Sequence, residues 1–228
     1  MSTERNIAQR PTLILVCKRP ALGHGKQRLA SRIGASAALV IAERLLDCAL
    51  EDLADWPGPV VIAPDQHDAA AWASTRAPQA ICLAQDSGNL GERLSALDNA
   101  LRRLGHGPLV FIGSDAPALT ARDYQRVSQA LAEQDTVLLG ARDGGVVLMA
   151  SNRPWPDLAT LPWSSADLGA ALAKACRGAG HSVAVCGESF DIDEQADLAY
   201  ALQALADDVR PARRRLLQTL REQHGTPP

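Results

Sequence analysis

Two of the three lysines in this chain, Lys18 and Lys26, lie in one short glycine-containing loop that follows an apolar run at residues 13–17. Seven cations occur between Arg5 and Arg32, and no acidic residue stands between Glu4 and Glu43. A compact ammonium group in a loop between a strand and a helix suits a phosphate, and such a loop also offers backbone N–H groups to an anion. Because the net charge of the chain is only -3, this local excess favours a phosphorylated small molecule over a nucleic acid.

Two common phosphate loops do not match these residues. A P-loop would need glycine at position 20 and Ser or Thr at position 27, where the chain has Pro20 and Gln27. A dinucleotide fingerprint that begins at Gly23 would need a small residue at position 28, where Arg28 stands. The remaining interpretation is a phosphate-binding loop that uses side-chain cations. The alternative is a solvated turn. We expect Lys26 and Arg28 to lie on an exposed loop.

A second candidate is Asp115, which follows the apolar run 108–113 after Gly113 and Ser114. Ligands bind beyond the carboxyl ends of strands in open α/β sheets, so this carboxylate is predicted at the ligand-binding edge. Mg²⁺ and Mn²⁺ are held by one or two carboxylates together with substrate phosphates. The alternative is an Asx-turn before Pro117.

A third candidate is the pair Asp191 and Asp193. Alternate side chains of an extended segment share a face, so both carboxylates can serve one metal ion while Ile192 points into the core. The alternative for Asp193 is that it caps the helix predicted from Gln195.

Two glycine-containing segments are ambiguous. Asp143-Gly144-Gly145 lies between two predicted strands, and Asp-Gly is a strong hairpin-turn signal, so a turn is favoured there. The segment from Gly88 to Gly91 can let a backbone approach a base or a sugar, or it can be an ordinary helix entry.

The elements that must position these residues alternate between strand and helix patterns. Strands are predicted at 12–17, 59–63, 80–84, 108–113, 136–140, 145–150 and 182–186. Helices are predicted at 36–54, 66–76, 92–104, 121–134, 164–177, 195–206 and 211–222. Thr120 with Asp123, and Ser164 with Asp167, resemble capping boxes. This alternation predicts a three-layer α/β/α sandwich with 12–17 as a central strand.

Composition bounds the organisation and the compartment. At 228 residues with 46% hydrophobic content, one domain over 12–222 is expected, with loose ends at 1–11 and 223–228. The five cysteines are far apart in the sequence, which predicts reduced core residues in a cytoplasmic protein. No signal peptide or membrane span is predicted.

Several short motifs resemble, in order, the bacterial GT-A-type glycosyltransferase-like family of the nucleotide-diphospho-sugar transferase superfamily, some members of which are labelled arsenosugar-biosynthesis glycosyltransferases. A more distant likeness is to phospholactate (phosphoenolpyruvate) and molybdenum-cofactor guanylyltransferases. The motifs extend from about residue 12 to 205 and are Lys18-x-Pro20, Gly23-x-x-Lys26-x-Arg28-Leu29, Gly88-x-Leu90-Gly91-Glu92-Arg93, Gly113-Ser114-Asp115-x-Pro117, Asp143-Gly144-Gly145, Pro162-Trp163-Ser164 and Asp191-Ile192-Asp193-x-x-x-Asp197-Leu198.

The resemblance implies a Rossmann-like GT-A fold with a mixed, mostly parallel sheet, and it implies roles for individual residues. The nucleotide-binding set would be Lys18, Gly23, Lys26, Arg28, Gly88, Leu90 and Gly91. The acceptor would face Asp143, Gly144 and Gly145. Asp115, Asp191 and Asp193 would bind Mg²⁺ or Mn²⁺, and Lys26 and Asp115 would be catalytic. The chain departs from the family at Gln27, Val146, Val147 and Glu194, which leaves the acceptor less determined than the nucleotide.

The function expected from these residues is metal-assisted transfer from an activated nucleotide. A nucleotide-sugar donor would make the protein a glycosyltransferase. The alternatives are a nucleotidyltransferase, which would join a nucleoside triphosphate to a phosphorylated acceptor, and a catalytically silent nucleotide-binding protein. The expected partners are a nucleotide or nucleotide sugar and a small-molecule acceptor, with no nucleic acid or membrane, and with a homodimer as an option.

Overall fold

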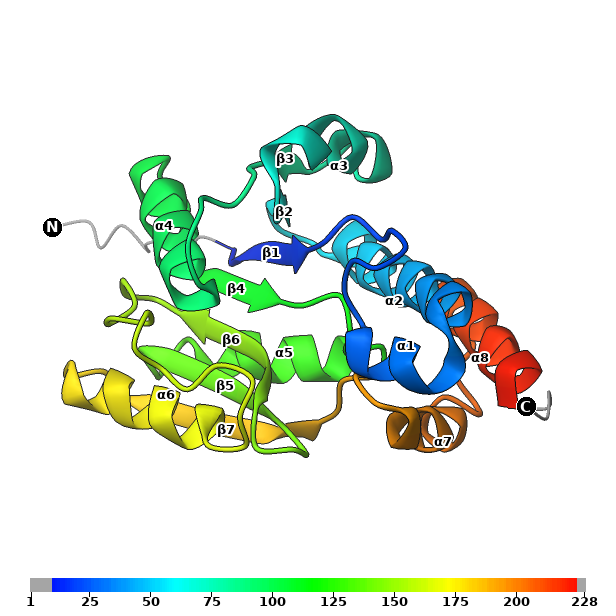
Figure 1. The fold of residues 1–228 in the computed structure, drawn as a ribbon. Helices are drawn as coiled ribbons and strands as arrows, with labels where there is room; N and C mark the ends of the chain where they lie inside the picture. Colours follow the sequence, from blue (N-terminus) through cyan, green and yellow to red (C-terminus); the bar gives the residue numbers. More distant parts are fainter. Residues whose placement is uncertain (1–9, 225–228) are drawn as a thin grey trace, which may run out of the picture.

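A seven-stranded mixed sheet lies at the centre of the computed structural model, which describes residues 10–224 (Figure 1). The strand order is β3-β2-β1-β4-β6-β5-β7, and only β6 runs antiparallel to its neighbours. The strands are β1 (Thr12–Cys17), β2 (Val60–Pro64), β3 (Ile81–Cys82), β4 (Leu109–Ile112), β5 (Thr136–Ala141), β6 (Val146–Ser151) and β7 (Val183–Ser189). The predicted mixed, mostly parallel sheet is therefore confirmed.

Helices cover both faces of the sheet (Figure 1). They are α1 (Gln27–Ile33), α2 (Ala35–Asp55), the 3-10 turn η1 (His67–Ala69), α3 (Ala70–Arg76), α4 (Leu90–Arg103), α5 (Ala121–Ala130), α6 (Leu168–Gly178), α7 (Gln195–Ala204) and α8 (Pro211–His224). Buried residues of α2, α3 and α5 pack on one face of the sheet, and those of α4 and α6 pack on the other. This is the predicted three-layer sandwich.

The apolar run in β1 explains why this strand is central. Leu13 and Leu15 pack in the core on the α2 side, whereas Ile14 packs in the core on the α4 side. Successive side chains of a strand point to opposite faces, so a strand covered on both sides needs apolar residues at every position. β1 meets this requirement and lies between β2 and β4.

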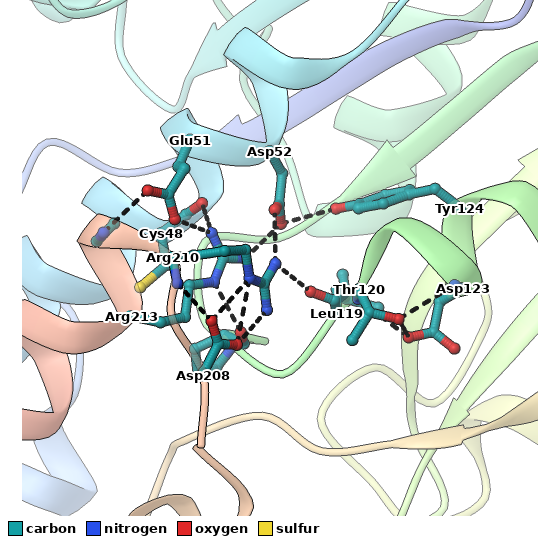
Figure 2. Close-up of polar contacts among 12 residues, drawn as sticks. Cys48, Glu51, Asp52, Leu119, Thr120, Asp123, Tyr124, Asp208, Arg210 and Arg213 are labelled. Atoms are coloured by element: carbon teal, nitrogen blue, oxygen red, sulfur yellow. Dashed lines mark hydrogen bonds and ion pairs between the residues drawn. The ribbon is translucent and has the colours of Figure 1, made fainter. Parts of the chain in front are cut away.

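A third cluster of buried apolar residues lies where α1, α7 and α8 pack together with α2 (Figure 1). Its apolar residues include Leu29, Ile41 and Leu216, all fully buried. Next to them, α8 buries the whole side chain of Arg213. Figure 2 shows that the guanidinium of Arg213 lies among carboxylates and backbone carbonyls from several elements.

The structure corrects the sequence prediction in two places near the phosphate loop and the cavity described below. A helix, α1, begins at Gln27, inside the segment predicted to be a loop; its seven residues are too few for a clear periodic pattern. The helix predicted from Ser164 begins only at Leu168, and Ser164 makes no capping box because its φ of 64° is left-handed. The capping box of Thr120 with Asp123 is confirmed.

Parts of the predicted loose ends, residues 1–9 and 225–228, lie outside the described residues, and α8 continues through His224. All five cysteines are free, as predicted. Between residues 10 and 224, no helix has the length and apolar character needed to cross a membrane.

Candidate functional site

A cavity of about 550 Å³ opens at the edge of the sheet where β1, β4, β5 and β7 end and β6 begins. This volume is in the usual range for small-molecule sites, and the position is the one expected for ligands of α/β sheets. The predicted site residues that line it are Lys18, Lys26, Arg28, Leu90, Asp115, Asp143, Gly145, Asp191 and Asp193.

Lys26 joins three segments of the chain at this cavity. Its Nζ donates to Asp115 Oδ2 at 3.1 Å and to Asp193 Oδ1 at 2.7 Å. Burial alone would lower the pKa of Lys26, but the charges of Asp115 and Asp193 and their hydrogen bonds raise it above its ordinary value. The ammonium group is therefore charged at neutral pH and holds the two carboxylates together.

The conformation of Lys26 differs from the exposed loop position that the sequence predicted. Only 11% of its side chain is exposed, and its φ of 48° is in the left-handed region. A lysine in that region is strained, and such strain persists only where surrounding contacts hold the residue. Lys26 immediately precedes α1, so this backbone conformation directs the ammonium group toward the two carboxylates instead of toward solvent.

The acidic segments after β4 and β7 lie side by side. The backbone N–H of Ile192 donates to the backbone carbonyl of Asp115 at 2.9 Å, and Ile192 is fully buried, as predicted. The alternative that Asp193 caps α7 is wrong, because Glu194 is the N-cap residue. The side chain of Asp193 faces Lys26 instead.

Asp191 carries the clearest sign of accumulated negative charge. Burial, together with the nearby charges of Asp115, Asp143 and Asp193, raises its pKa from 3.8 to about 6. Between residues 10 and 224, however, no group of three or more His, Cys, Asp or Glu side chains is spaced to hold a metal ion. The ammonium of Lys26 stands between two of the three predicted ligands, so a shared metal site stays a proposal.

The other predicted cations lie on the rim of the cavity. Lys18 is exposed, and Arg28, 62% exposed, is 3.6 Å from Glu194. His24 Nε2 lies 3.1 Å from Asp65 Oδ2. This contact holds the loop against the residue that follows β2, and a role of Lys18 and Arg28 in binding an anionic ligand stays a prediction.

Four of the predicted glycines are not on the cavity wall, namely Gly23, Gly88, Gly91 and Gly144. At Gly91 a Cβ atom would lie 2.0 Å from the Leu158 carbonyl oxygen, so glycine is needed there for packing. At Gly144, with a φ of +91°, a Cβ atom would lie 2.0 Å from the Ala166 carbonyl oxygen. The proposed contacts of these glycines with a ligand stay predictions.

The hairpin turn predicted at Asp143 is confirmed. Asp143 Oδ1 accepts from the Gly145 N–H at 2.9 Å, and β5 pairs with β6. The turn lies on the cavity wall with Val146, Trp163 and Ser164. Val146 and Trp163 add apolar surface to this part of the cavity wall.

The polar residues of this cavity to which sequence reasoning gave no role include Gln85 and Arg93. Gln85 is only 2% exposed although it follows a two-residue strand, and Arg93 lies on the first turn of α4. Arg93 belongs to the Gly88–Arg93 motif, which gave it a position but no role. Nothing in the local pattern marked Gln85, whose hydrogen bonds are with the distant strand β2.

Asp191→Asn should stabilise the metal-free protein at neutral pH. The folded-state pKa of about 6 is above the ordinary 3.8, so the protonated carboxyl is favoured in the fold, and this contribution is lost as pH rises from about 4 to about 6. Discounted for solvent screening, the gain from Asn is about 1–2 kcal/mol above pH 6 and falls towards zero near pH 4. Urea unfolding in EDTA at several pH values measures it. Asp68→Asn, which removes an exposed carboxylate, is the control, and an equal gain there would contradict the assignment.

Solved structures with the same fold are similar to this chain over most of its length. A protein from Desulfovibrio desulfuricans G20, described as a "putative nucleotide-diphospho-sugar transferase", is 21% identical, with a TM-score of 0.82 over 95% of this chain and 96% of that one. Rv0371C from Mycobacterium tuberculosis H37Rv, solved in complex with manganese, is 15% identical, with a TM-score of 0.50 over 84% and 97% of the two chains. A 4-diphosphocytidyl-2C-methyl-D-erythritol synthase from Anaerococcus prevotii DSM 20548 is 10% identical, with a TM-score of 0.52 over 84% and 96%.

These identities are all below 25%, so the likenesses establish the fold, which is that of nucleotide-diphospho-sugar transferase structures. A comparison with curated proteins gave no match. A sequence family does match residues 48–165, just over half of the chain, and this stretch includes β2 to β6 with Gln85, Arg93, Asp115 and the Asp143 turn. The chain therefore belongs to the bacterial family described as "Uncharacterized protein conserved in bacteria (DUF2064)".

Proposed function

We propose that this protein is a metal-dependent transferase that binds a nucleotide and uses a nucleotide sugar as its donor. The observation that carries the proposal is the position of the Lys26 ammonium, between Asp115 and Asp193 on the wall of a cavity with two more cations at its rim. Cations and carboxylates that converge on one cavity suit a ligand with both phosphates and a bound metal ion. The fold shared with the Desulfovibrio desulfuricans protein supports the same class.

Two groups of lining residues would have separate roles in this reaction. In the first group, Lys18 and Arg28 would contact the donor phosphates, and Lys26 would stabilise negative charge on the departing phosphate group. In the second group, the Asp143 turn and Trp163 would position the acceptor for attack. Most of the rate enhancement would then come from charge stabilisation and positioning.

The carboxylates fit a metal ion that arrives with its nucleotide. Asp115, Asp191 and Asp193 supply oxygen ligands of the kind that Mg²⁺ and Mn²⁺ prefer, and one or two protein carboxylates are enough when phosphate oxygens complete the coordination. When bound, the metal would neutralise charge on the phosphates. The manganese complex of Rv0371C, which shares the fold, supports this choice of ions.

The second candidate function is nucleotidyl transfer. Three cations from the loop after β1 and the start of α1, Lys18, Lys26 and Arg28, suit a triphosphate as well as a diphosphate. The fold is also shared with a synthase whose name specifies a diphosphocytidyl product. The two functions differ in the leaving group, which is a nucleoside diphosphate in glycosyl transfer and diphosphate in nucleotidyl transfer.

The test is a screen of nucleoside triphosphates and nucleotide sugars with Mg²⁺ or Mn²⁺ by thermal shift, followed by assays for the released group. A ligand at 100-fold its dissociation constant stabilises the fold by about 2.7 kcal/mol. Release of nucleoside diphosphate in the presence of an acceptor supports the first function, and release of diphosphate supports the second. Binding without metal or turnover would contradict both and indicate a silent nucleotide-binding protein.

Lys18→Ala should weaken binding of the nucleotide found in this screen by about 1.5–3 kcal/mol, because an exposed ammonium on the cavity rim would lose a charge-assisted contact. Arg19→Ala is the matched control, since Arg19 is the exposed neighbour that does not line the cavity. Calorimetric titration measures both. Equal affinities for wild type and Lys18→Ala would contradict the phosphate-binding role of the loop.

A further inference from the structure

One cation neutralises both of the acidic segments that meet at the cavity. Among residues 10–224, Lys26 is the only cation that makes an ion pair with Asp115 or Asp193, with distances of 3.1 and 2.7 Å from Nζ to the carboxylate oxygens. Arg28 pairs instead with Glu194, at 3.6 Å. The Lys26 ammonium therefore occupies the space between two carboxylates that the sequence predicted as ligands of one metal ion.

This position of Lys26 opposes the binding of a second cation. Mg²⁺–oxygen bonds are only about 2.1 Å long, so an ion that bonded to the same two oxygens would lie close to Nζ and be repelled by it. Access is not the barrier, because the side chains of Asp115 and Asp193 are 37% and 49% exposed. In the nucleotide-free protein, charge rather than burial therefore decides whether these carboxylates can bind a metal ion.

The local structure allows the Lys26 side chain to leave this position. A lysine has a flexible stem, and the left-handed φ of 48° at Lys26 is one that a lysine keeps only where contacts hold it. The neighbouring Gly25 has a φ of +83°, and beyond the adjacent residues a Cβ atom there would contact no described atom nearer than Lys18 Cδ, at 4.0 Å. The loop is loosely packed at this point, so a competing anion in the cavity can draw the ammonium away from the carboxylates.

We propose that Lys26 keeps divalent metal ions out of the site until a nucleotide arrives. Without a nucleotide, its ammonium neutralises Asp115 and Asp193. Phosphate groups that enter the cavity attract the ammonium, and its departure restores the negative charge of the two carboxylates. This inference rests on the proposed metal-dependent function and adds an order to it: the ammonium moves to the phosphates before the carboxylates accept a metal ion.

Titration of the full chain with Mn²⁺ alone, followed by the electron paramagnetic resonance signal of free Mn²⁺ at about pH 8, tests the exclusion of metal. Lys26→Met should bind Mn²⁺ about tenfold or more tightly than wild type, because the competing charge is gone. Adding Asp193→Asn to Lys26→Met should remove this gain. Lys18→Met is the matched control, since it removes the same charge from an exposed position at the cavity, and its Mn²⁺ affinity should stay within about threefold of wild type.

NMR of ¹⁵N-labelled lysine follows the movement of Lys26 in the wild type, because the chain has only three lysines. The signal that is absent in Lys26→Met belongs to Lys26. Mg²⁺ alone should leave this signal unchanged, whereas inorganic pyrophosphate with Mg²⁺ should shift it. If Lys26→Met does not fold, Lys26→Gln takes its place in both experiments, because it keeps a hydrogen-bond donor and removes the charge.

The outcomes separate this inference from the function on which it rests. Equal Mn²⁺ affinities of wild type and the Lys26 variant, a gain that survives Asp193→Asn, or a shift of the Lys26 signal with Mg²⁺ alone would each overturn the exclusion of metal by Lys26. If the Lys26 variant gains Mn²⁺ affinity but neither pyrophosphate nor any screened nucleotide binds the wild type, the proposed function is overturned and the exclusion of metal stands.

Discussion

Asp115→Asn should lower turnover by about 10²–10³-fold and abolish the metal-dependent stabilisation by nucleotide, while the metal-free fold stays nearly as stable as wild type. The substitution keeps the shape of the side chain and removes the negative charge that faces Lys26. Asp115 is 37% exposed, and Lys26 keeps its bond to Asp193, so the loss of apo stability should be about 1 kcal/mol or less. Thermal shift with and without Mg²⁺ and nucleotide, together with the turnover assay, measures these effects.

The control for Asp115→Asn is Asp68→Asn, which removes an exposed carboxylate on η1. It should leave both turnover and metal-dependent stabilisation unchanged. Asp193→Asn provides an internal comparison, because this substitution also removes a carboxylate partner of Lys26. Asp193 is not the N-cap residue of α7, so the comparison is not complicated by a helix cap. Full activity of Asp115→Asn would contradict a role for this carboxylate in the reaction and would leave it as a structural partner of Lys26.

Arg213→Met should cost about 3–5 kcal/mol of unfolding free energy, because it removes the cation from a buried cluster of charges. Arg213 is fully buried and donates to Asp52 Oδ2 at 2.7 Å and to Glu51 Oε2 at 3.0 Å (Figure 2). It also donates to the Pro117 carbonyl at 3.0 Å, within the loop that follows Asp115. The variant therefore removes one cation from two partly or fully buried carboxylates, of which Asp52 keeps only Arg210 and Tyr124 as donors among the described residues, and it loosens the attachment of this loop to α8.

The charge state of the cluster follows from its contacts. Burial raises the pKa of Asp52 and so opposes its ionisation. For Arg213, burial lowers the pKa but the charge of Asp52 raises it, and the net effect is a raised pKa. Two guanidinium groups and the Tyr124 hydroxyl donate to the Asp52 carboxylate (Figure 2). A carboxylate that accepts from three donors is stabilised in its charged form, so we treat the pair as ionised.

Urea unfolding compares wild type, Arg213→Met and Arg214→Met, where Arg214 is the exposed neighbour on α8. The control should lie within about 0.5 kcal/mol of wild type. A loss of 3–5 kcal/mol in Arg213→Met corresponds to a fall in Tm of about 10 °C for a chain of this size. A loss below about 1 kcal/mol would show that the remaining cation, Arg210, compensates for the two carboxylates. Arg213→Lys, which keeps a charge but loses the planar fork, should lie between the two variants.

Much of the fold could be predicted from the sequence because its signals are local. The apolar strand patterns gave all seven strands, and β1 is apolar at successive positions because both faces of it are covered. The hairpin at Asp143 and the capping box at Thr120 depend on residues only two or three positions apart. The sequence also predicted which segments reach the cavity, because the carboxyl ends of parallel strands meet at one edge of the sheet. These segments are the cationic loop, Gly113-Ser114-Asp115 and Asp191-Ile192-Asp193.

Other features were decided only by tertiary structure. Lys26 was expected on an exposed loop, but the hydrogen bonds that it donates to Asp115 and Asp193, 89 and 167 positions away, hold it on the cavity wall in a left-handed conformation. Gln85 has no local signal, because its burial and the direction of its amide depend on the Ala63 carbonyl in β2. The burial of Arg213 depends on α2 and on the loop after β4. A sequence pattern contains information only about residues a few positions apart. The hydrogen-bond partners and charges at this site come from distant segments, so they are decided by how those segments pack on the sheet.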